Sequence, residues 1–484
     1  MESKFKVLVL HALRPTSRQT TIDHIGSFRS HLADCDVQYL HFQQPISGAA
    51  QQTRTDLLIV NYDFLNYRFT PLWPFIRNRY IKLAKNAGKV VAIAQDDFWA
   101  NKLLDNWCMK WEVDRILTPI DTDREVLYPR SIKSKEFRTG LTGYVKSGPV
   151  PATPPLRDRK IDLGQRVRDM PPHLGRLAQA KARQAVSFAE SARRSGFIVD
   201  VSTRVEDSFI GTAWFDFLAS CKFTVGMKGG ASLHDPWGLT HTKVESFCAR
   251  RPGATFDEIE RHCFKGKDMQ HQFTAISPRL FEAALAGTCQ ILQRDDYLGV
   301  LEPWRDYIPL EPDLSNIDEV LDVMTDLDRC QAIADSARVR LVDSGIFDYR
   351  RLAEEATDGL LQTPTVEPRW NSLVNELRES EAIFRRFGAD QHDACLNLII
   401  EMILKLKKQE FSTFVSSVLN VSSSEEIELP GAGRSEQLAT REVLRDIVER
   451  NAQRAFVNLA TAHRHDNLSW RAPWTWRPFT EAST

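Results

Sequence analysis

The stretch Ser277-Pro-Arg-Leu-Phe-Glu-Ala-Ala-Leu-Ala-Gly287, followed by Thr288-Cys-Gln-Ile-Leu292, has the pattern of a helix and a buried strand. Ser277 belongs to the residue types that cap helix N-termini, and Pro278 suits the first helical position. Gly287 can end the helix in a left-handed conformation. The apolar run that follows reads as a short strand. The stretch therefore predicts a helix–strand unit with both helix ends defined.

This helix has two different faces. Leu280, Phe281, Ala284 and Leu285 form an apolar face, whereas Arg279 and Glu282 share another face with two alanines, Ala283 and Ala286. The helix N-terminus offers free N–H groups and a partial positive charge, which suit a phosphate. Two interpretations stay open at this point: a ligand-binding face, or an ordinary amphipathic helix with an exposed Arg–Glu pair.

Length and composition indicate a globular protein of two or three domains. The chain has 484 residues, 42% hydrophobic and 26% charged, and a net charge of -1. This balance does not favour nucleic acid or an acidic membrane surface as a partner. The eight cysteines are scattered without paired metal-ligand spacing, which predicts reduced thiols and no structural zinc. No apolar run approaches the length of a membrane span, so we expect a cytoplasmic protein.

The N-terminal part alternates between strands and helices. Such alternation predicts a parallel sheet covered on both faces, with ligands beyond the carboxyl ends of the strands. Three loops leave those ends: His11–Thr20, Asn61–Tyr67 and Gln95–Trp99. No G-x-G-x-x-G follows the first strand, so no nicotinamide or flavin cofactor is expected. The expected strands are Lys6–Leu10, Val37–Phe42, Asp56–Asn61, Gly88–Gln95 and Arg115–Ile120, and the expected helices are Thr20–Leu32, Pro71–Asn86 and Asp97–Lys110.

Two Pro-rich segments divide the chain. Gly148–Pro155 and Gln362–Pro368 read as linkers. They divide the chain into residues 1–147, 156–361 and 369–484, of which the first two alternate strands with helices and the third is expected to be a helical extension. The extension ends with Trp470, Trp474 and Trp476 among several arginines, which indicates either a contact with a partner or membrane surface or a tail packed on the core.

Several polar residues of the second domain are candidates for binding. Lys228, Gly229, Gly230 and Ser232 belong to a small-residue loop at a strand end, where backbone N–H groups can approach a phosphate; a plain turn is the alternative. Arg166 and Arg204 follow strands and could each face a diphosphate. Residues 235–272 are expected to form a polar flap. Four histidines in or next to it have no metal-ligand spacing and are predicted to be loop residues: His234, His241, His262 and His271.

The segment Arg159–Arg350 resembles the nucleotide-binding half of GT-B glycosyltransferases. More narrowly, it is similar to "glycosyltransferase family 1" proteins of bacterial surface-polysaccharide clusters. The resemblance is carried by Ile276–Glu282, Leu301–Pro309, Trp214–Cys221 and Gly229–Asp235. It implies an α/β GT-B fold in which two Rossmann-like domains face a cleft. It also implies that Glu282 binds the ribose hydroxyls of the donor; the second glutamate of many relatives is replaced here by Thr274.

The resulting hypothesis is a glycosyltransferase that uses a nucleotide-sugar donor and a glycan, lipid-linked or small-molecule acceptor. Ser277, Arg279, Lys228 and the Gly229–Ser232 loop would bind the diphosphate or sugar. No Asp-x-Asp occurs at a convincing strand end, so no catalytic metal is expected. Asp97 is the first choice for the general base and His11 the second. A nucleotide-sugar epimerase of the same fold and a non-catalytic glycan-binding or partner-binding protein are the alternatives.

Overall fold

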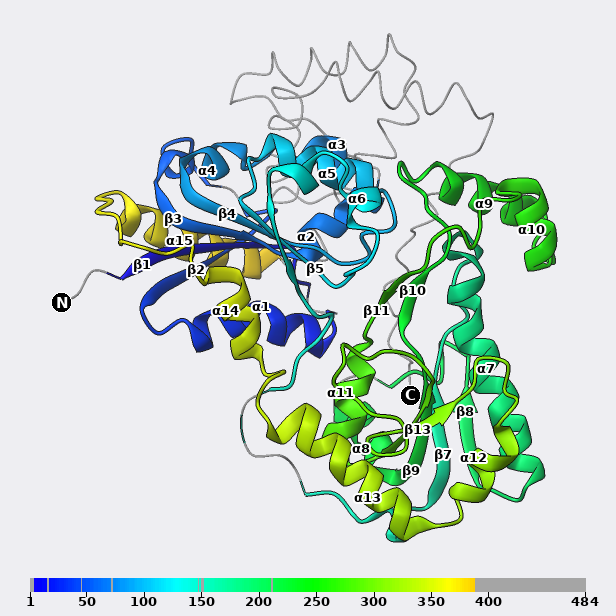
Figure 1. Ribbon diagram of the computed structural model, residues 1–484. Coiled ribbons are helices and arrows are strands. Elements are labelled where there is room, and N and C mark those ends of the chain that lie inside the picture. The colour runs from blue at the N-terminus through cyan, green and yellow to red at the C-terminus, as the bar shows by residue number, and fades with distance from the viewer. Residues whose placement is uncertain are drawn as a thin grey trace.

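The structure is a computed structural model that describes residues 4–14, 17–44, 46–70, 73–146, 148, 152–209 and 212–387. Within these residues the chain forms two large parallel sheets, each with helices on both faces (Figure 1). The two sheets belong to two domains that lie one above the other in Figure 1 and meet along one side.

The described part of the N-terminal domain contains a six-stranded parallel sheet of order β2-β1-β3-β4-β5-β6. The register is continuous, because Val7 pairs with Val37 on one side and with Leu57 on the other. The strands are β1 (Phe5–His11), β2 (Cys35–His41), β3 (Thr55–Val60), β4 (Ala87–Ile93), β5 (Arg115–Thr118) and β6 (Glu136–Thr139). The helices are α1 (Gln19–His31), α2 (Tyr62–Leu65), α3 (Trp73–Ile76), α4 (Ile81–Asn86), α5 (Asn101–Lys110) and α6 (Arg124–Leu127).

Alternate residues of these strands enter two different cores. Leu8 and Leu58 pack with the side that carries α3, α4 and α5, whereas Val7 and Leu57 pack with the side that carries α1. Each of these four side chains is completely buried. Burial on both faces explains why the strands are continuous apolar runs in the sequence.

The C-terminal domain contains, among its described residues, a five-stranded parallel sheet of order β13-β12-β9-β7-β8. Its core is formed by apolar residues of β7, β9, β12 and β13 together with α7, α12 and α13. The strands are β7 (Ile161–Arg166), β8 (Val199–Ser202), β9 (Cys221–Gly226), β12 (Cys289–Gln293) and β13 (Ile308–Leu310). The helices are α7 (Gly175–Arg194), α8 (Thr212–Ser220), α11 (Pro278–Leu285), α12 (Ile317–Val323) and α13 (Leu327–Arg338).

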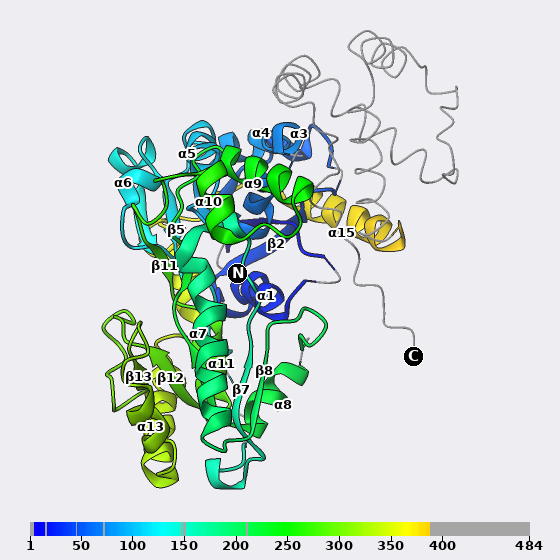
Figure 2. The same cartoon turned by 90° about the vertical axis from the view of Figure 1, so that its right-hand side faces the viewer.

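A hairpin and two helices extend from this domain toward the other one (Figures 1 and 2). The hairpin pairs β10 (Gly229–Ala231) with β11 (Phe273–Ala275) in antiparallel orientation. Helices α9 (Leu239–Arg250) and α10 (Phe256–Cys263) lie between the two strands in sequence. The segment expected to be a polar flap is therefore largely helical. The prediction of loop residues is wrong for His241 and His262, which lie on α9 and α10.

The chain returns to the N-terminal domain before the boundary predicted at residue 361. Backbone pairing joins Val145 to Asp348, and α14 (Tyr349–Thr357) packs against α1. Helix α15 (Trp370–Phe387) then contacts β2. The predicted domain boundary was wrong because α14 carries apolar residues that complete the N-terminal core. The predicted helices and tryptophans beyond residue 387 lie outside the described residues.

Most predicted elements of the N-terminal sheet, and the predicted helix–strand unit Ser277–Leu292, are confirmed with ends shifted by one or two residues. The predicted helix Pro71–Asn86 is instead divided into α3 and α4. The carbonyl of Arg77, between them, accepts hydrogen bonds from the indoles of Trp107 and Trp111 at 3.0 and 2.9 Å. No helix in the described ranges has both the length and the apolar character needed to cross a membrane.

Candidate functional site

A pocket opens at the carboxyl end of the C-terminal sheet, below the N-terminus of α11. It has an empty volume of about 450 Å³ that includes its open mouth. We name it the α11 pocket. The strands β7, β9 and β12 form its floor, and α7, α8 and α11 supply its polar and aromatic walls. Its lining includes Gln165, Lys181, Trp214, Gly226, Ser277, Arg279, Gln290 and Tyr297.

The N-terminus of α11 is held at the junction of the two domains. Thr142, from the N-terminal domain, donates a hydrogen bond of 2.6 Å to the carbonyl of Ile276. A Cβ atom on Gly143 would lie 2.8 Å from Cβ of Pro278, so only a glycine allows this close approach without a shift. Ser277 has the extended backbone of an N-cap residue, although its side chain makes no capping hydrogen bond. The helix end therefore faces both the pocket and the opposite domain.

Two cationic side chains converge in the pocket. Burial, reinforced by the charge of Arg279, lowers the pKa of Lys181 to about 8. Burial also lowers the pKa of Arg279 to about 10, and the charges of Arg18 and Arg168 act in the same direction. Among the described residues, Lys181 forms no ion pair with a carboxylate. An uncompensated cation beside an arginine and a helix N-terminus creates a site for a doubly charged anion.

The Arg279–Glu282 face of α11 is built around Trp214. The Arg279 guanidinium donates to Gln165 Oε1 at 2.9 Å and to the carbonyl of Arg166, and it lies 4.9 Å from the centre of the Trp214 ring. The Trp214 indole donates to Glu282 Oε2 at 2.7 Å. Both charged side chains are thus oriented by neighbours. The two alanines predicted to share this face, Ala283 and Ala286, are instead buried in the core.

The small-residue segment after β9 does not form the phosphate-binding loop that the sequence predicted. Gly229 and Gly230 are strand residues of β10, and Gly230 packs directly on the backbone of Phe273. Ser232 is completely buried; its hydroxyl donates to Asp268 at 2.6 Å and accepts from Leu177 N near the start of α7. Their polar groups are therefore used in the hairpin and at the start of α7.

The other three predicted cations are all engaged elsewhere. Lys228 forms an ion pair of 3.0 Å with Asp295, next to the pocket-lining Tyr297. Arg166 forms an ion pair with Asp200 at 2.8 Å and stacks on Phe217, and it is not one of the residues that line the pocket. Arg204 is exposed and lies 3.6 Å from Glu206. Arg166 and Arg204 are structural and surface residues in this structure.

The predicted base Asp97 lies in the interior of the N-terminal domain. It is completely buried and accepts hydrogen bonds from Tyr128, at 2.6 Å, and from Thr118. Burial raises its pKa. An acceptor hydroxyl cannot reach a carboxylate without exposed surface, so this geometry argues against Asp97 as the base.

Its neighbour Asp96 is exposed at the end of β4, with a left-handed backbone (φ 53°). The buried guanidinium of Arg68 holds this turn by donating to the carbonyls of Gln95 and Asp96, both at 2.9 Å. Gln95 in turn donates to the carbonyl of Thr142, the residue that contacts Ile276. The turn that carries Asp96 is thus linked through Gln95 and Thr142 to the residue before α11, and an uncommon backbone conformation often marks a functional site. Burial raises the pKa of the Asp96 carboxyl, and the nearby charge of Arg68 acts against this rise.

His11, the second predicted base, packs edge-on against the rings of Tyr39 and His41. Its Nδ1 accepts a hydrogen bond of 3.1 Å from the backbone N–H of Leu13. Burial lowers the pKa of His11 to about 4, so its imidazole is a weak base at neutral pH.

Sequence reasoning missed Lys181, Arg168, Arg18 and Asp96 as residues of this junction. Lys181 is one of several cations on a long amphipathic helix, and only the fold shows which of them turns into the pocket. Arg18 lies in a loop that the sequence did place at the carboxyl edge. Asp96 is the chain neighbour of the predicted base Asp97, and the two cannot be distinguished without the turn that Arg68 holds.

Two Rossmann-like parallel-sheet domains that meet at the carboxyl ends of their strands define the GT-B class of fold. No protein-family model matches the chain, and no curated protein sequence matches it. Three distantly similar solved structures are TarM of S. aureus, HepE of Anabaena in complex with UDP-glucose, and an alpha1,3-fucosyltransferase with GDP-fucose.

All three likenesses are weak. The TarM chain is 11% identical over 66% of this chain and 54% of its own, with a TM-score of 0.37. HepE is 11% identical over 74% of this chain and 99% of its own, with a TM-score of 0.39. The fucosyltransferase is 11% identical over 76% of this chain and 93% of its own, with a TM-score of 0.36. The chain thus spans about half the length of TarM.

Proposed function

We propose that this protein is a glycosyltransferase that moves a sugar from a nucleotide-sugar donor to a hydroxyl group. One observation carries the proposal: Lys181, Arg279 and the N-terminus of α11 converge in one pocket at the carboxyl end of a Rossmann-like sheet. The two phosphates of a nucleotide sugar match this arrangement of two cations and free N–H groups.

The same groups have a chemical role in transfer. When the bond to the sugar breaks, negative charge develops on the leaving diphosphate, and cations already in position stabilise it. Lys181 is buried in the pocket wall, and Gln165 accepts a hydrogen bond that orients Arg279. We propose that they replace a metal ion at the diphosphate, and that the reaction needs no added Mg²⁺ or Mn²⁺.

Glu282 and Trp214 would bind the nucleoside. The Glu282 carboxylate, oriented by the Trp214 indole at 2.7 Å, can accept hydrogen bonds from two ribose hydroxyls. The acceptor would approach from the N-terminal domain, where Asp96 is exposed at the junction. A glycan, lipid-linked or small-molecule acceptor is compatible with this placement, and we propose a role in glycan or surface-polysaccharide biosynthesis.

Calorimetric titration of UDP and GDP tests the proposed donor site. Wild-type protein should bind at least one of them, and Lys181→Met and Arg279→Gln should each weaken binding by about 10- to 100-fold, because a charge-assisted hydrogen bond is worth ~1.5–3 kcal/mol. Lys243→Met, which removes an exposed lysine on α9, is the matched control and should bind as wild type does. Undiminished binding by both pocket variants would exclude this site.

The pH dependence of binding provides a further test. Below about pH 8 Lys181 is protonated, and above it the free protein must take up a proton to bind the diphosphate. Affinity should therefore fall by at most about tenfold per pH unit above pH 8 in wild type, and this lysine-dependent fall should be absent in Lys181→Met. Because burial disfavours the charged form, Lys181→Met should not destabilise the free protein at neutral pH.

Incubation with nucleotide sugars distinguishes the reaction types. Release of nucleoside diphosphate that depends on an acceptor supports transfer, and it should persist in EDTA without added Mg²⁺ or Mn²⁺. An altered sugar still attached to the nucleotide would instead identify an epimerase. Binding without turnover would identify a non-catalytic protein.

A further inference from the structure

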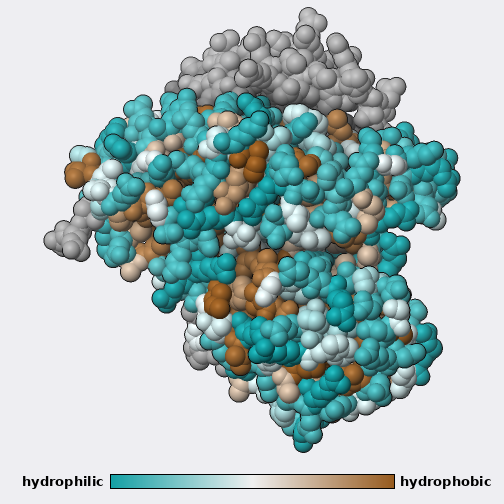
Figure 3. Space-filling view, in the orientation of Figure 1, coloured by the Kyte–Doolittle hydropathy of each residue, from teal (hydrophilic) through white to brown (hydrophobic). Residues whose placement is uncertain are grey.

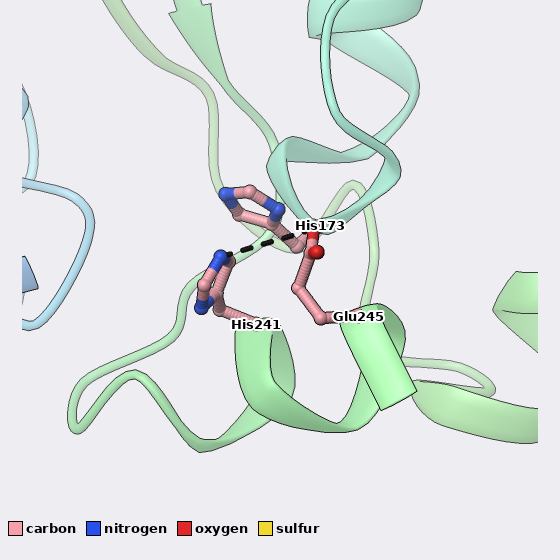
Figure 4. A group of neighbouring side chains, drawn as sticks. All are labelled: His173, His241 and Glu245. Carbon is pink, nitrogen blue, oxygen red and sulfur yellow. Dashed lines mark ion pairs between the residues drawn. The ribbon is translucent and has the colours of Figure 1, made fainter. Parts of the chain in front are cut away.

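Two buried histidines and a glutamate meet on the side of the C-terminal domain that contacts the N-terminal one (Figure 4). His173 lies in the short helix Pro172–Leu174 that precedes α7. His241 and Glu245 are one turn apart on α9, with His241 Nε2 3.9 Å from a carboxylate oxygen of Glu245. The two imidazole rings are 4.3 Å apart between centres. One potential ligand atom from each residue lies within 4.8 Å of the others.

The buried imidazole of His173 lacks the hydrogen bonds that such a group normally makes. Its side chain is 3% exposed, and neither of its ring nitrogens has a hydrogen-bond partner. A buried polar group without a partner costs roughly 1–3 kcal/mol, so such groups usually have one in the functional protein. As Figure 4 shows, the imidazole of His173 stands next to that of His241 and above the carboxylate of Glu245. A ligand bound by all three side chains would give the His173 imidazole the partner that it lacks.

We infer that His173, His241 and Glu245 bind a zinc ion. Two imidazoles and a carboxylate form a donor set that zinc accepts, and they leave a fourth position for water. Ligand atoms around a tetrahedral zinc lie roughly 3.4 Å apart, given bonds of about 2.1 Å. The potential ligand atoms lie within 4.8 Å of one another, and those of His241 and Glu245 are 3.9 Å apart, so zinc binding would draw them closer together. Hard cations such as Mg²⁺ and Ca²⁺ prefer oxygen ligands and should not compete.

The cluster lies at a contact between the two domains. The Trp99 ring of the N-terminal domain lies 4.8 Å from the His173 ring and 4.6 Å from the His241 ring. Beside it, Ala100 N donates to the carbonyl of Asp235 at 2.9 Å. A zinc ion would thus join the start of α7 to α9 where the hairpin–helix segment contacts the other domain. This site shares no residue with the α11 pocket, so it does not depend on the proposed function.

Metal analysis of the full-length protein tests the inference. After equilibration with Zn²⁺ and removal of free metal, wild-type protein should retain one zinc ion. The variants Glu245→Gln and His173→Asn should each bind zinc at least about 100-fold more weakly. This estimate follows because even the loss of an outer-shell partner lowers metal affinity about 10–100-fold. Glu245 is partly exposed, so Glu245→Gln should fold normally. His262→Asn, which removes an exposed histidine of α10, is the matched control and should bind zinc as wild type does.

Thermal unfolding provides an independent readout. Zinc should raise the melting temperature of wild type and of His262→Asn, but not that of Glu245→Gln. Absence of zinc binding by wild type would overturn the inference. Equal zinc content in wild type, His173→Asn and Glu245→Gln would also overturn it, because the ion would then be bound by other residues of the chain.

Discussion

Asp96 and Asp97 are neighbours in the chain but have different surroundings. Asp97 points into the core, where Tyr128 and Thr118 donate hydrogen bonds to it. Asp96 is exposed at the domain junction, in a turn held by the Arg68 guanidinium. A general base must contact the hydroxyl whose proton it accepts. If the protein transfers sugars, Asp96 is therefore the member of the pair that can act on an acceptor.

Substitution of each aspartate should separate the two roles. Asp96→Asn should slow turnover by about 10²–10⁴-fold, the usual range for loss of a general base, with unchanged UDP or GDP affinity. Asp97→Asn should change the free energy of unfolding by about 1–3 kcal/mol, because it alters a buried hydrogen-bonded carboxylate, and should slow turnover by less than about tenfold. Steady-state kinetics and urea unfolding measure the two effects. If Asp96→Asn turned over as fast as wild type, Asp96 would not be the general base.

At the residue scale the sequence predicted part of the site. Ser277 and Arg279 line the pocket as part of a helix whose ends were readable locally. Arg166, Ser232 and Asp97 were misplaced because their partners come from segments about 20 to 55 residues away, and side-chain pairing at such distances has no local signal. Lys181 was missed because its unusual environment is created by α11, which is nearly 100 residues further along the chain.

At the scale of elements, the segment after β9 shows how a glycine pair can mislead. Two adjacent glycines at a strand end are compatible with a phosphate-binding loop or with a plain turn, but here they form β10. A Cβ on Gly230 would lie 1.9 Å from the carbonyl oxygen of Phe273, and the φ of Gly230 is +150°. Gly230 is thus required by contact with β11, whereas a Cβ on Gly229 would meet no atom within 4 Å.

These two glycines permit a matched pair of variants. Gly230→Ala should lower the free energy of unfolding by at least about 2 kcal/mol, because it introduces both backbone strain and a clash with an immobile carbonyl. Gly229→Ala should change it by less than about 0.5 kcal/mol. Calorimetric melting of both variants measures the difference. Equal stability would show that β10 does not pack on β11 as described.

The elements that the sequence predicted well are those with strong local patterns. The apolar runs of β1, β3, β4 and β12 could be placed within one or two residues because burial on both sheet faces leaves few polar positions. The short strands β6, β10 and β11 were missed. Their three or four residues carry no periodicity, and they exist through pairing with other segments.

At the scale of the whole molecule, the segment that follows the C-terminal domain packs against the N-terminal domain through residues 355–365. The Arg115 guanidinium of β5 is buried and donates to the carbonyls of Glu355 and Asp358, at 3.0 and 2.7 Å. Thr365 donates from both its N–H and its hydroxyl to Asp56. The polar surface visible in Figure 3 is interrupted by apolar residues where the two domains meet. The sequence predicted a domain boundary at Gln362–Pro368 because a Pro/Thr-rich segment resembles a linker. The contacts that its two ends make with the N-terminal domain cannot be read from its composition.

Trp370, at the start of α15, tests this arrangement. Its side chain is 4% exposed, and its indole donates a hydrogen bond of 2.7 Å to Asp36 in β2. Trp370→Ala would leave a cavity between α15 and the sheet, and such a loss typically costs about 3–5 kcal/mol. If α15 is part of the N-terminal domain, the amides of β1 and β2 should exchange with solvent faster in this variant.

A second tryptophan supplies the control. Trp237 is 47% exposed, and Lys102 is its cationic neighbour at 5.5 Å. Trp237→Ala should therefore cost no more than about 1 kcal/mol and leave exchange in β1 and β2 unchanged. Hydrogen exchange resolved by segment compares the two variants directly. If α15 instead belonged to a separate extension, Trp370→Ala would leave exchange in β2 at the wild-type rate, and the return of the chain to the first domain would end with α14.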